Sequence, residues 1–186
     1  MKLISHRLRG FAARELAIEG LRAALARGVS SVEIDTRVTA DGVIVVRHDR
    51  FLSGEGGTCA IERLSFEAAR ARAPELERLE AFLEIAASAP ADFELLLDLK
   101  GGRAPLQHLA LARAHGLAAR TTFVSWRPEV LQALMAAAPE QRLAFSHIAM
   151  SERGLRQALT RLATAGLSRR AFALGAGLFA PRLAAE

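Results

Sequence analysis

The stretch from Ser31 to Asp49 reads SVEIDTRVTADGVIVVRHD, and it combines β-rich runs with a turn sequence. Residues 29–38 alternate apolar and polar side chains, which is typical of a β-strand. Residues 39–42 (TADG) predict a turn, because Asp-Gly suits hairpin geometry. Residues 43–46 are rich in β-branched side chains again. The stretch therefore predicts two strands joined by a tight turn.

Predicted strands and helices alternate on both sides of this stretch. The further predicted strands span residues 2–6, 93–99, 121–126, 142–146 and 171–178. The predicted helices span residues 15–27, 105–115, 128–138 and 152–165, with two more between the third and fourth strands. Residues 93–99 are almost continuously apolar, as expected of a strand that is buried on both faces.

This rhythm of strands and helices predicts the fold class. Strands separated by helices form parallel sheets. A closed barrel of eight β/α units typically takes about 250 residues, and this chain has 186. We therefore expect an α/β fold: a TIM-type (β/α) barrel, shortened or incomplete at its C-terminal end, or else an open α/β sheet. No internal repeat or low-complexity linker divides the sequence, so residues 1–186 are expected to form a single domain.

The composition argues against several classes of protein. Hydrophobic residues make up 51% and charged residues 24%, which argues against disorder. No apolar stretch approaches the roughly 20 residues of a membrane span, and the opening MKLISHR lacks the apolar run of a signal peptide. The single cysteine, Cys59, cannot form an internal disulfide. We expect a soluble, cytoplasmic protein without stable membrane insertion.

The net charge of +5 raises the question of nucleic-acid binding. Most of the positive charge is arginine, since the only lysines are Lys2 and Lys100. The arginines are interleaved with glutamates along the predicted helices, which is typical of solvated, ion-paired helix faces. Because no recognition motif accompanies the charge, we favour an affinity for anionic small-molecule substrates over nucleic acid.

Polar residues cluster at the ends of the predicted strands, where α/β enzymes place their sites. They are His6 and Arg7, Glu33 and Asp35, His48 and Asp49, Asp98 and Lys100, and Ser125 and Trp126. Ionisable groups in apolar strands are costly unless they are paired or bound to a metal. The carboxylates suit a hard divalent cation, and the histidines suit general acid–base chemistry. The cationic side chains suit a phosphate.

Four motifs follow one another in the chain: ISHR (residues 4–7), VEIDTRVTADGVIVVRHD (32–49), LLLDLK (95–100) and VSWRPEVLQAL (124–134). In this order they resemble the glycerophosphodiester phosphodiesterase family, a branch of the phospholipase-C-like TIM-barrel phosphodiesterases. The resemblance runs from about Leu3 to about His147 and continues weakly beyond. It implies a (β/α) barrel that hydrolyses phosphodiesters with the help of a divalent cation, Mg²⁺ or Ca²⁺.

The resemblance also implies roles for individual residues. Glu33, Asp35 and Asp98 would bind the metal. His6 and His48 would form the acid–base pair, without an assignment of which is the acid. Arg7 and Lys100 would lie at the phosphate, and Trp126 would either contact the alcohol group of the substrate or pack at the rim of the barrel.

Some positions depart from the family pattern or stay open. Leu8 stands where the family usually has glycine, Asp98 stands where it commonly has glutamate, and a late strand with a tryptophan is missing. Asp49 either orients His48 or caps the following loop, and Glu15 either starts a helix or supports Arg7. The remaining histidines and the cysteine are expected to lie outside the site, the histidines mostly at the surface or at helix ends. They are His108, His115, His147 and Cys59.

The leading hypothesis is hydrolysis of glycerophosphodiesters to an alcohol and glycerol 3-phosphate. A second is a shortened, catalytically weak relative that acts as a binding or regulatory protein. Its exposed sheet edge and apolar helix faces would then be covered by a partner, or by a second copy in a homodimer. A third is a phosphodiesterase of the same superfamily that acts on a lysophospholipid or a sugar phosphodiester.

Overall fold

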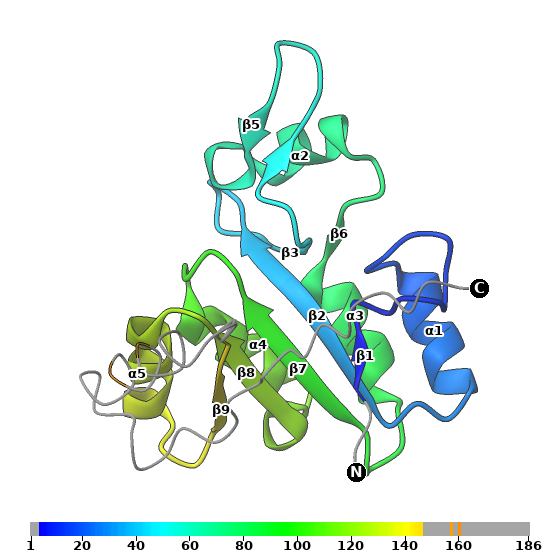
Figure 1. The fold of residues 1–186 in the computed structure, drawn as a ribbon, viewed down its shortest axis with the longest axis vertical. Coiled ribbons are helices and arrows are strands. Elements are labelled where there is room, and N and C mark those ends of the chain that lie inside the picture. Colours follow the sequence, from blue (N-terminus) through cyan, green and yellow to red (C-terminus); the bar gives the residue numbers. More distant parts are fainter. Residues whose placement is uncertain (1–3, 147–156, 158–159, 161–186) are drawn as a thin grey trace.

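The computed structural model describes residues 4–146, 157 and 160, and residues 31–38 form a strand in the middle of its main sheet (Figure 1). The strands are β1 (Ser5–His6), β2 (Ser31–Val38), β3 (Ile44–Val46), β4 (Phe51–Leu52), β5 (Cys59–Ala60), β6 (Glu77–Arg78), β7 (Glu94–Leu99), β8 (Thr121–Ser125) and β9 (Arg142–Phe145). The α-helices are α1 (Ile18–Ala26), α2 (Phe66–Arg72), α3 (Leu79–Ala87), α4 (Pro105–Ala114) and α5 (Pro128–Ala137). Two short 3₁₀ turns, η1 (Ile61–Arg63) and η2 (Ala118–Arg120), complete the described elements.

The main sheet runs in the order β6-β3-β2-β7-β8-β9, and β1 also pairs with β2. The pairs β1–β2, β2–β7, β7–β8 and β8–β9 are all parallel. A helix follows each of β7 and β8 before the next strand begins, which is the β/α rhythm of a TIM-type barrel. The predicted α/β, TIM-type fold class is confirmed.

The predicted turn after β2 turns the chain back on itself. Residues 44–46 pair antiparallel with residues 36–38, so β3 is a hairpin partner of β2 rather than a β/α unit of its own. Thr39 donates a hydrogen bond to the Asp41 carboxylate, which also accepts from the backbone N–H of Phe66 at 3.1 Å. Gly42 has φ +84°, a conformation that side chains disfavour.

The main core lies between the sheet and its helices. Val32, Ile34 and Val38 of β2 are buried in one apolar cluster with Phe82 of α3 and Leu131 of α5. These β2 residues are separated by even numbers of positions, so they share the face that the helices cover. Glu33, Asp35 and Arg37 alternate with them and therefore lie on the opposite face, inside the curve of the sheet.

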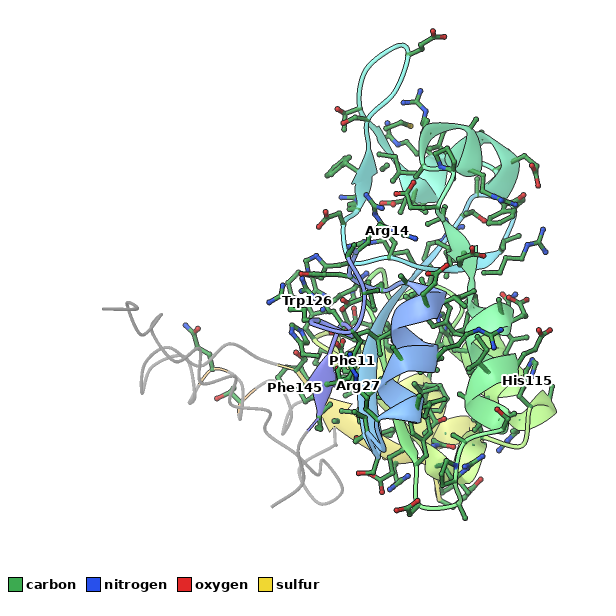
Figure 2. The ribbon with its side chains drawn as sticks, turned by 90° about the vertical axis from the view of Figure 1, so that its right-hand side faces the viewer. Phe11, Arg14, Arg27, His115, Trp126 and Phe145 are labelled. Atoms are coloured by element: carbon green, nitrogen blue, oxygen red, sulfur yellow. The ribbon has the colours of Figure 1, made fainter. Side chains whose placement is uncertain are left out.

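A small lobe projects from the main body, formed by β4, β5, η1 and α2 (Figures 1 and 2). It has its own apolar cluster, in which Leu52, Ile61, Phe66 and Leu76 pack against Val45 of β3. The short strands β4 and β5 pair antiparallel around the polar, Gly-rich loop. The sequence predicted the loop and a helix here but not these strands.

Most predicted elements match those observed, with small shifts at their ends. The predicted helix 15–27 begins later, at Ile18, because residues 7–16 form an irregular loop with left-handed positions. The predicted helix 152–165 and strand 171–178 lie outside the described residues, apart from Gln157 and Thr160. Within the described part of the chain, every helix is too short or too polar to cross a membrane.

Candidate active site

Three carboxylates meet at the carboxyl ends of two neighbouring strands. Glu33 and Asp35 lie two residues apart on β2, and the parallel register places Asp35 directly beside Asp98 of β7. One oxygen of each lies within 4.8 Å of the others, and all three residues are buried. The structure thus brings together the three residues expected to bind a metal.

The electrostatics of this cluster favour a bound cation. Burial, together with repulsion from Asp35 and Asp98, raises the pKa of Glu33 to about 8. Burial also raises the pKa of Asp98, although Lys100 opposes that shift. Oδ1 of Asp98 is buried and accepts no hydrogen bond from the described residues. Because buried carboxylate oxygens need a donor or a cation, this oxygen-only set fits a hard divalent ion.

Two cationic side chains border the cluster. Nε of Arg7 lies 2.9 Å from Oδ2 of Asp35, and Nζ of Lys100 lies 2.9 Å from Oδ1 of the same residue. Lys100 also donates a short hydrogen bond to Asp98. Burial by itself would lower the pKa of Lys100, but Asp98 and Asp35 outweigh it and raise the pKa. Lys100 is therefore charged, and two cations face three carboxylates.

The segment after β1 has a conformation that is unusual for its residues. Arg7 and Leu8 both have φ +56°, in the left-handed region, which costs about 1–2 kcal/mol per residue without glycine. The backbone N–H of Arg7 donates to the Glu33 carboxylate at 3.2 Å, and the Leu8 side chain is fully buried. Leu8, which stands where the family usually has glycine, therefore anchors a strained loop by its burial. Such strain is frequent at functional sites.

His6 ends β1 beside the carboxylates. Its Nε2 lies 3.6 Å from Oε2 of Glu33, and about half of its side chain is exposed. Burial lowers the pKa of His6, and Arg7 lowers it further, whereas Asp35 opposes the shift. At neutral pH the imidazole is therefore neutral and can accept a proton.

His48 is held by its neighbours at the end of the hairpin. Its Nδ1 lies 2.8 Å from a carboxylate oxygen of Asp49, which can only accept, so Nδ1 carries the proton and Nε2 presents a lone pair. Of the two alternatives left open by the sequence, Asp49 thus orients His48. Nε of Arg37 donates to the His48 carbonyl at 2.8 Å.

Two supporting residues could not be assigned from the sequence. Glu15 lies before α1 rather than in it, 3.6 Å from Arg7 and 2.6 Å from Arg9, so it supports the arginines instead of starting the helix. Arg37 was not singled out. Arg37 follows Asp35 by two positions on β2, so the two side chains share one face of the strand. This spacing could have indicated that Arg37 lies near the site.

The expectation that His108 is a surface or helix-end residue was wrong. His108 lies within α4 with only 1% of its surface exposed. Its ring nitrogens lie 3.0 Å from the Thr36 hydroxyl and 2.9 Å from the Ala104 carbonyl. Burial lowers its pKa to about 4, so the ring is neutral. The two polar contacts explain why a histidine is tolerated in the core.

Trp126 follows β8 at the mouth of the site. Its indole is largely exposed, and Nε1 donates to the Lys100 carbonyl at 3.3 Å. In Figure 2 it lies on the opposite side of the molecule from His115, which ends α4. A cavity of about 570 Å³ opens here, and Trp126 and Lys100 are among the residues that line it. The aromatic side chain is therefore placed against space that a substrate could fill.

Solved structures share this fold. A glycerophosphodiester phosphodiesterase from Agrobacterium tumefaciens is 29% identical, with a TM-score of 0.63 over 78% of this chain and 67% of its own. One from Parabacteroides distasonis is 21% identical, with a TM-score of 0.67 over 89% and 76%. A phosphodiesterase from Oleispira antarctica, solved with its product sn-glycerol-3-phosphate, is 22% identical, with a TM-score of 0.67 over 89% and 72%.

A comparison with curated protein sequences gives no match. The family model described as the glycerophosphoryl diester phosphodiesterase family matches residues 6–184, which is nearly the whole chain. The resemblance seen in the sequence is therefore confirmed. The chain belongs to the glycerophosphoryl diester phosphodiesterase family, a family of phosphoric diester hydrolases.

Proposed function

We propose that the protein hydrolyses glycerophosphodiesters to an alcohol and glycerol 3-phosphate, using Mg²⁺ or Ca²⁺ held by Glu33, Asp35 and Asp98. The observation that carries the proposal is the buried carboxylate cluster, in which the Glu33 pKa is raised to about 8 and one Asp98 oxygen has no hydrogen-bond donor among the described residues. The Oleispira antarctica neighbour with bound sn-glycerol-3-phosphate supports the choice of product.

The cations of the site would receive the phosphate. When bound, a divalent cation would neutralise charge on the phosphate oxygens. Arg7 and Lys100 already lie against Asp35 at the edge of the cluster, so a phosphate placed there would meet two further positive charges. Both side chains would stabilise the negative charge that grows on the phosphoryl oxygens in the transition state.

His6 and His48 would transfer the protons. One imidazole would take a proton from the nucleophile, which is water or a neighbouring hydroxyl of the substrate, and the other would protonate the departing alkoxide. The neutral form of His6 and the Nε2 lone pair of His48 support this pairing. The two roles are not assigned between His6 and His48, because both imidazoles lie at the edge of the same carboxylate cluster.

The test is hydrolysis of glycerophosphoglycerol by the full chain, before and after complete removal of divalent cations. We expect activity only with a cation present, and a loss of about 10²- to 10⁴-fold in kcat for His6→Ala and for His48→Ala. His115→Ala is the matched control, because His115 ends α4 on the opposite side of the molecule from Trp126 (Figure 2). Full activity after chelation, or unchanged activity in His6→Ala, would overturn the mechanism.

A further inference from the structure

The cavity beside the carboxylates is strongly basic. It is lined by four cationic side chains together with one carboxylate and one indole: Arg37, Arg50, Lys100, Arg127, Glu62 and Trp126. We call this cavity the basic pocket. Its residues come from β2, the loop after β3, η1 and the segments that follow β7 and β8, so the fold collects them from distant parts of the chain.

The basic pocket is continuous with the proposed reaction site through Lys100. Its ammonium group contacts Asp35 and Asp98, and its carbonyl accepts the hydrogen bond from Trp126. A diester whose phosphorus lies at the carboxylate cluster would therefore extend one of its two alcohol groups into the pocket. Its walls then decide which alcohols are accepted.

The positive charges of the pocket are incompletely compensated. Arg50 is paired with Glu62, and Arg127 pairs with Glu129 at 2.8 Å on the exposed rim. Arg37 donates to a backbone carbonyl and has no carboxylate within ion-pair distance among the described residues. Guanidinium groups stay charged when partly buried. The lining thus presents a positive field inside a concave surface, which concentrates anions.

We propose that the basic pocket selects glycerophosphodiesters whose leaving alcohol carries a second anionic group, such as a phosphate monoester. Arg50 and Arg127 would bind that group, because both side chains are about half exposed and a guanidinium has more N–H donors than one ion pair uses. The Trp126 indole would pack against the carbon skeleton of the alcohol. The inference rests on the proposed function and names its substrate class. In the reaction, the bond from phosphorus to the leaving oxygen breaks, water supplies the new oxygen on phosphorus, and the leaving oxygen takes a proton.

The experiment compares two substrates that differ in one group. They are glycerophosphoglycerol, whose leaving group is neutral, and the same diester with a terminal phosphate monoester. We expect kcat/KM to be at least about tenfold higher for the phosphorylated diester, the effect of one charge-assisted hydrogen bond. Arg50→Gln and Arg127→Gln should each reduce this ratio, and the double variant should bring it to about one. Arg113→Gln, which alters an exposed arginine on α4, should leave the ratio unchanged.

A second measurement separates this inference from the proposed function. Equal kcat/KM for both diesters would overturn the inference while hydrolysis itself upheld the function. If neither diester is hydrolysed, the proposed function fails. Dissociation constants of the two diesters, measured by calorimetry, then test whether the basic pocket prefers the phosphorylated one. A dissociation constant about tenfold lower for the phosphorylated diester, lost in the double variant, would support the pocket's selectivity. Equal constants, or a preference that survives in the double variant, would overturn it.

Discussion

The two faces of β2 are built in opposite ways. The face under the helices carries Val32, Ile34 and Val38, which are packed in the main core. The other face carries Glu33 and Asp35, buried carboxylates whose charges repel. Because side chains of a strand alternate, one segment supplies both faces at a fixed spacing. The first face stabilises the fold by apolar packing, whereas the second holds repelling carboxylates that a bound cation would stabilise.

The largest expected effect is on the charged face. Glu33→Gln removes a proposed metal ligand and should lower kcat/KM by about 10³-fold. In chelator the free energy of unfolding should stay the same or rise, since the amide avoids the cost of either charging or protonating a buried carboxyl whose pKa is raised to about 8. Kinetics and urea unfolding measure the two quantities, with the exposed Glu84→Gln on α3 as the control. A strongly destabilised variant with intact activity would contradict the assignment of this face.

A substitution on the apolar face of β2 should lower stability and leave activity largely unchanged. Ile34→Ala leaves a cavity in the core and should lower the free energy of unfolding by about 3 kcal/mol. The folded fraction should keep most of its activity, because Ile34 points away from the carboxylates. Chemical denaturation and kinetics on the same preparation test this. Unchanged stability would show that the helices do not pack on this face as described.

The helix-covered side of the sheet should also respond to pH, because His108 of α4 is buried there against Thr36. Its pKa is lowered to about 4 from an ordinary 6.5, so between these values the unfolded chain binds more protons than the folded chain. Its contribution to stability is therefore present above pH 6.5 and is lost as the pH falls toward 4. From pH 7 to pH 5 we expect a loss of about 2 kcal/mol.

The pH dependence is measured by urea unfolding in chelator. His108→Gln should lose this part of the pH dependence, and the difference between the two proteins isolates His108 from the other titrating groups. Identical slopes for the wild type and the variant would show that His108 can be protonated without loss of structure.

The smallest expected effect is at the exposed rim. Trp126→Ala should raise KM for glycerophosphoglycerol by about fivefold, or about 1 kcal/mol of contact with the alcohol group. The free energy of unfolding should barely change, since more than half of the surface of Trp126 is exposed. Steady-state kinetics and thermal unfolding test the two statements together. A marked fall in stability with unchanged KM would favour the alternative in which Trp126 packs the rim.

Much of this arrangement could be predicted because it follows from spacing. Alternation of side chains along residues 31–38 predicted that Glu33 and Asp35 share one face. The carboxyl ends of parallel strands lie at the same edge of a sheet, which predicted that Asp98 lies near them. The spacing of residues in the sequence does not predict the tertiary contacts of a single side chain. His108 was misassigned because helical periodicity does not reveal a hydroxyl on the neighbouring strand, here Thr36, that satisfies a buried imidazole.

The loop after β1 escaped prediction for another reason. Local sequence preference disfavours a left-handed Leu8, and only tertiary burial of its side chain stabilises that conformation. The same loop places Arg7 against Asp35 and Glu15. The sequence therefore predicted that Arg7 lies at the site. It did not predict the contacts of Arg7 with Asp35 and Glu15, because these depend on a left-handed turn that no sequence pattern indicates.

Binding of a divalent cation by Glu33, Asp35 and Asp98 can be measured by calorimetric titration of the chelator-stripped chain with Mg²⁺ and with Ca²⁺. We predict a single binding site in the wild type and in the Glu84→Gln control, and an affinity weaker by about 100-fold or more in Glu33→Gln and Asp98→Asn. Absence of binding in the wild type, or equal affinity in Glu33→Gln, would contradict this assignment.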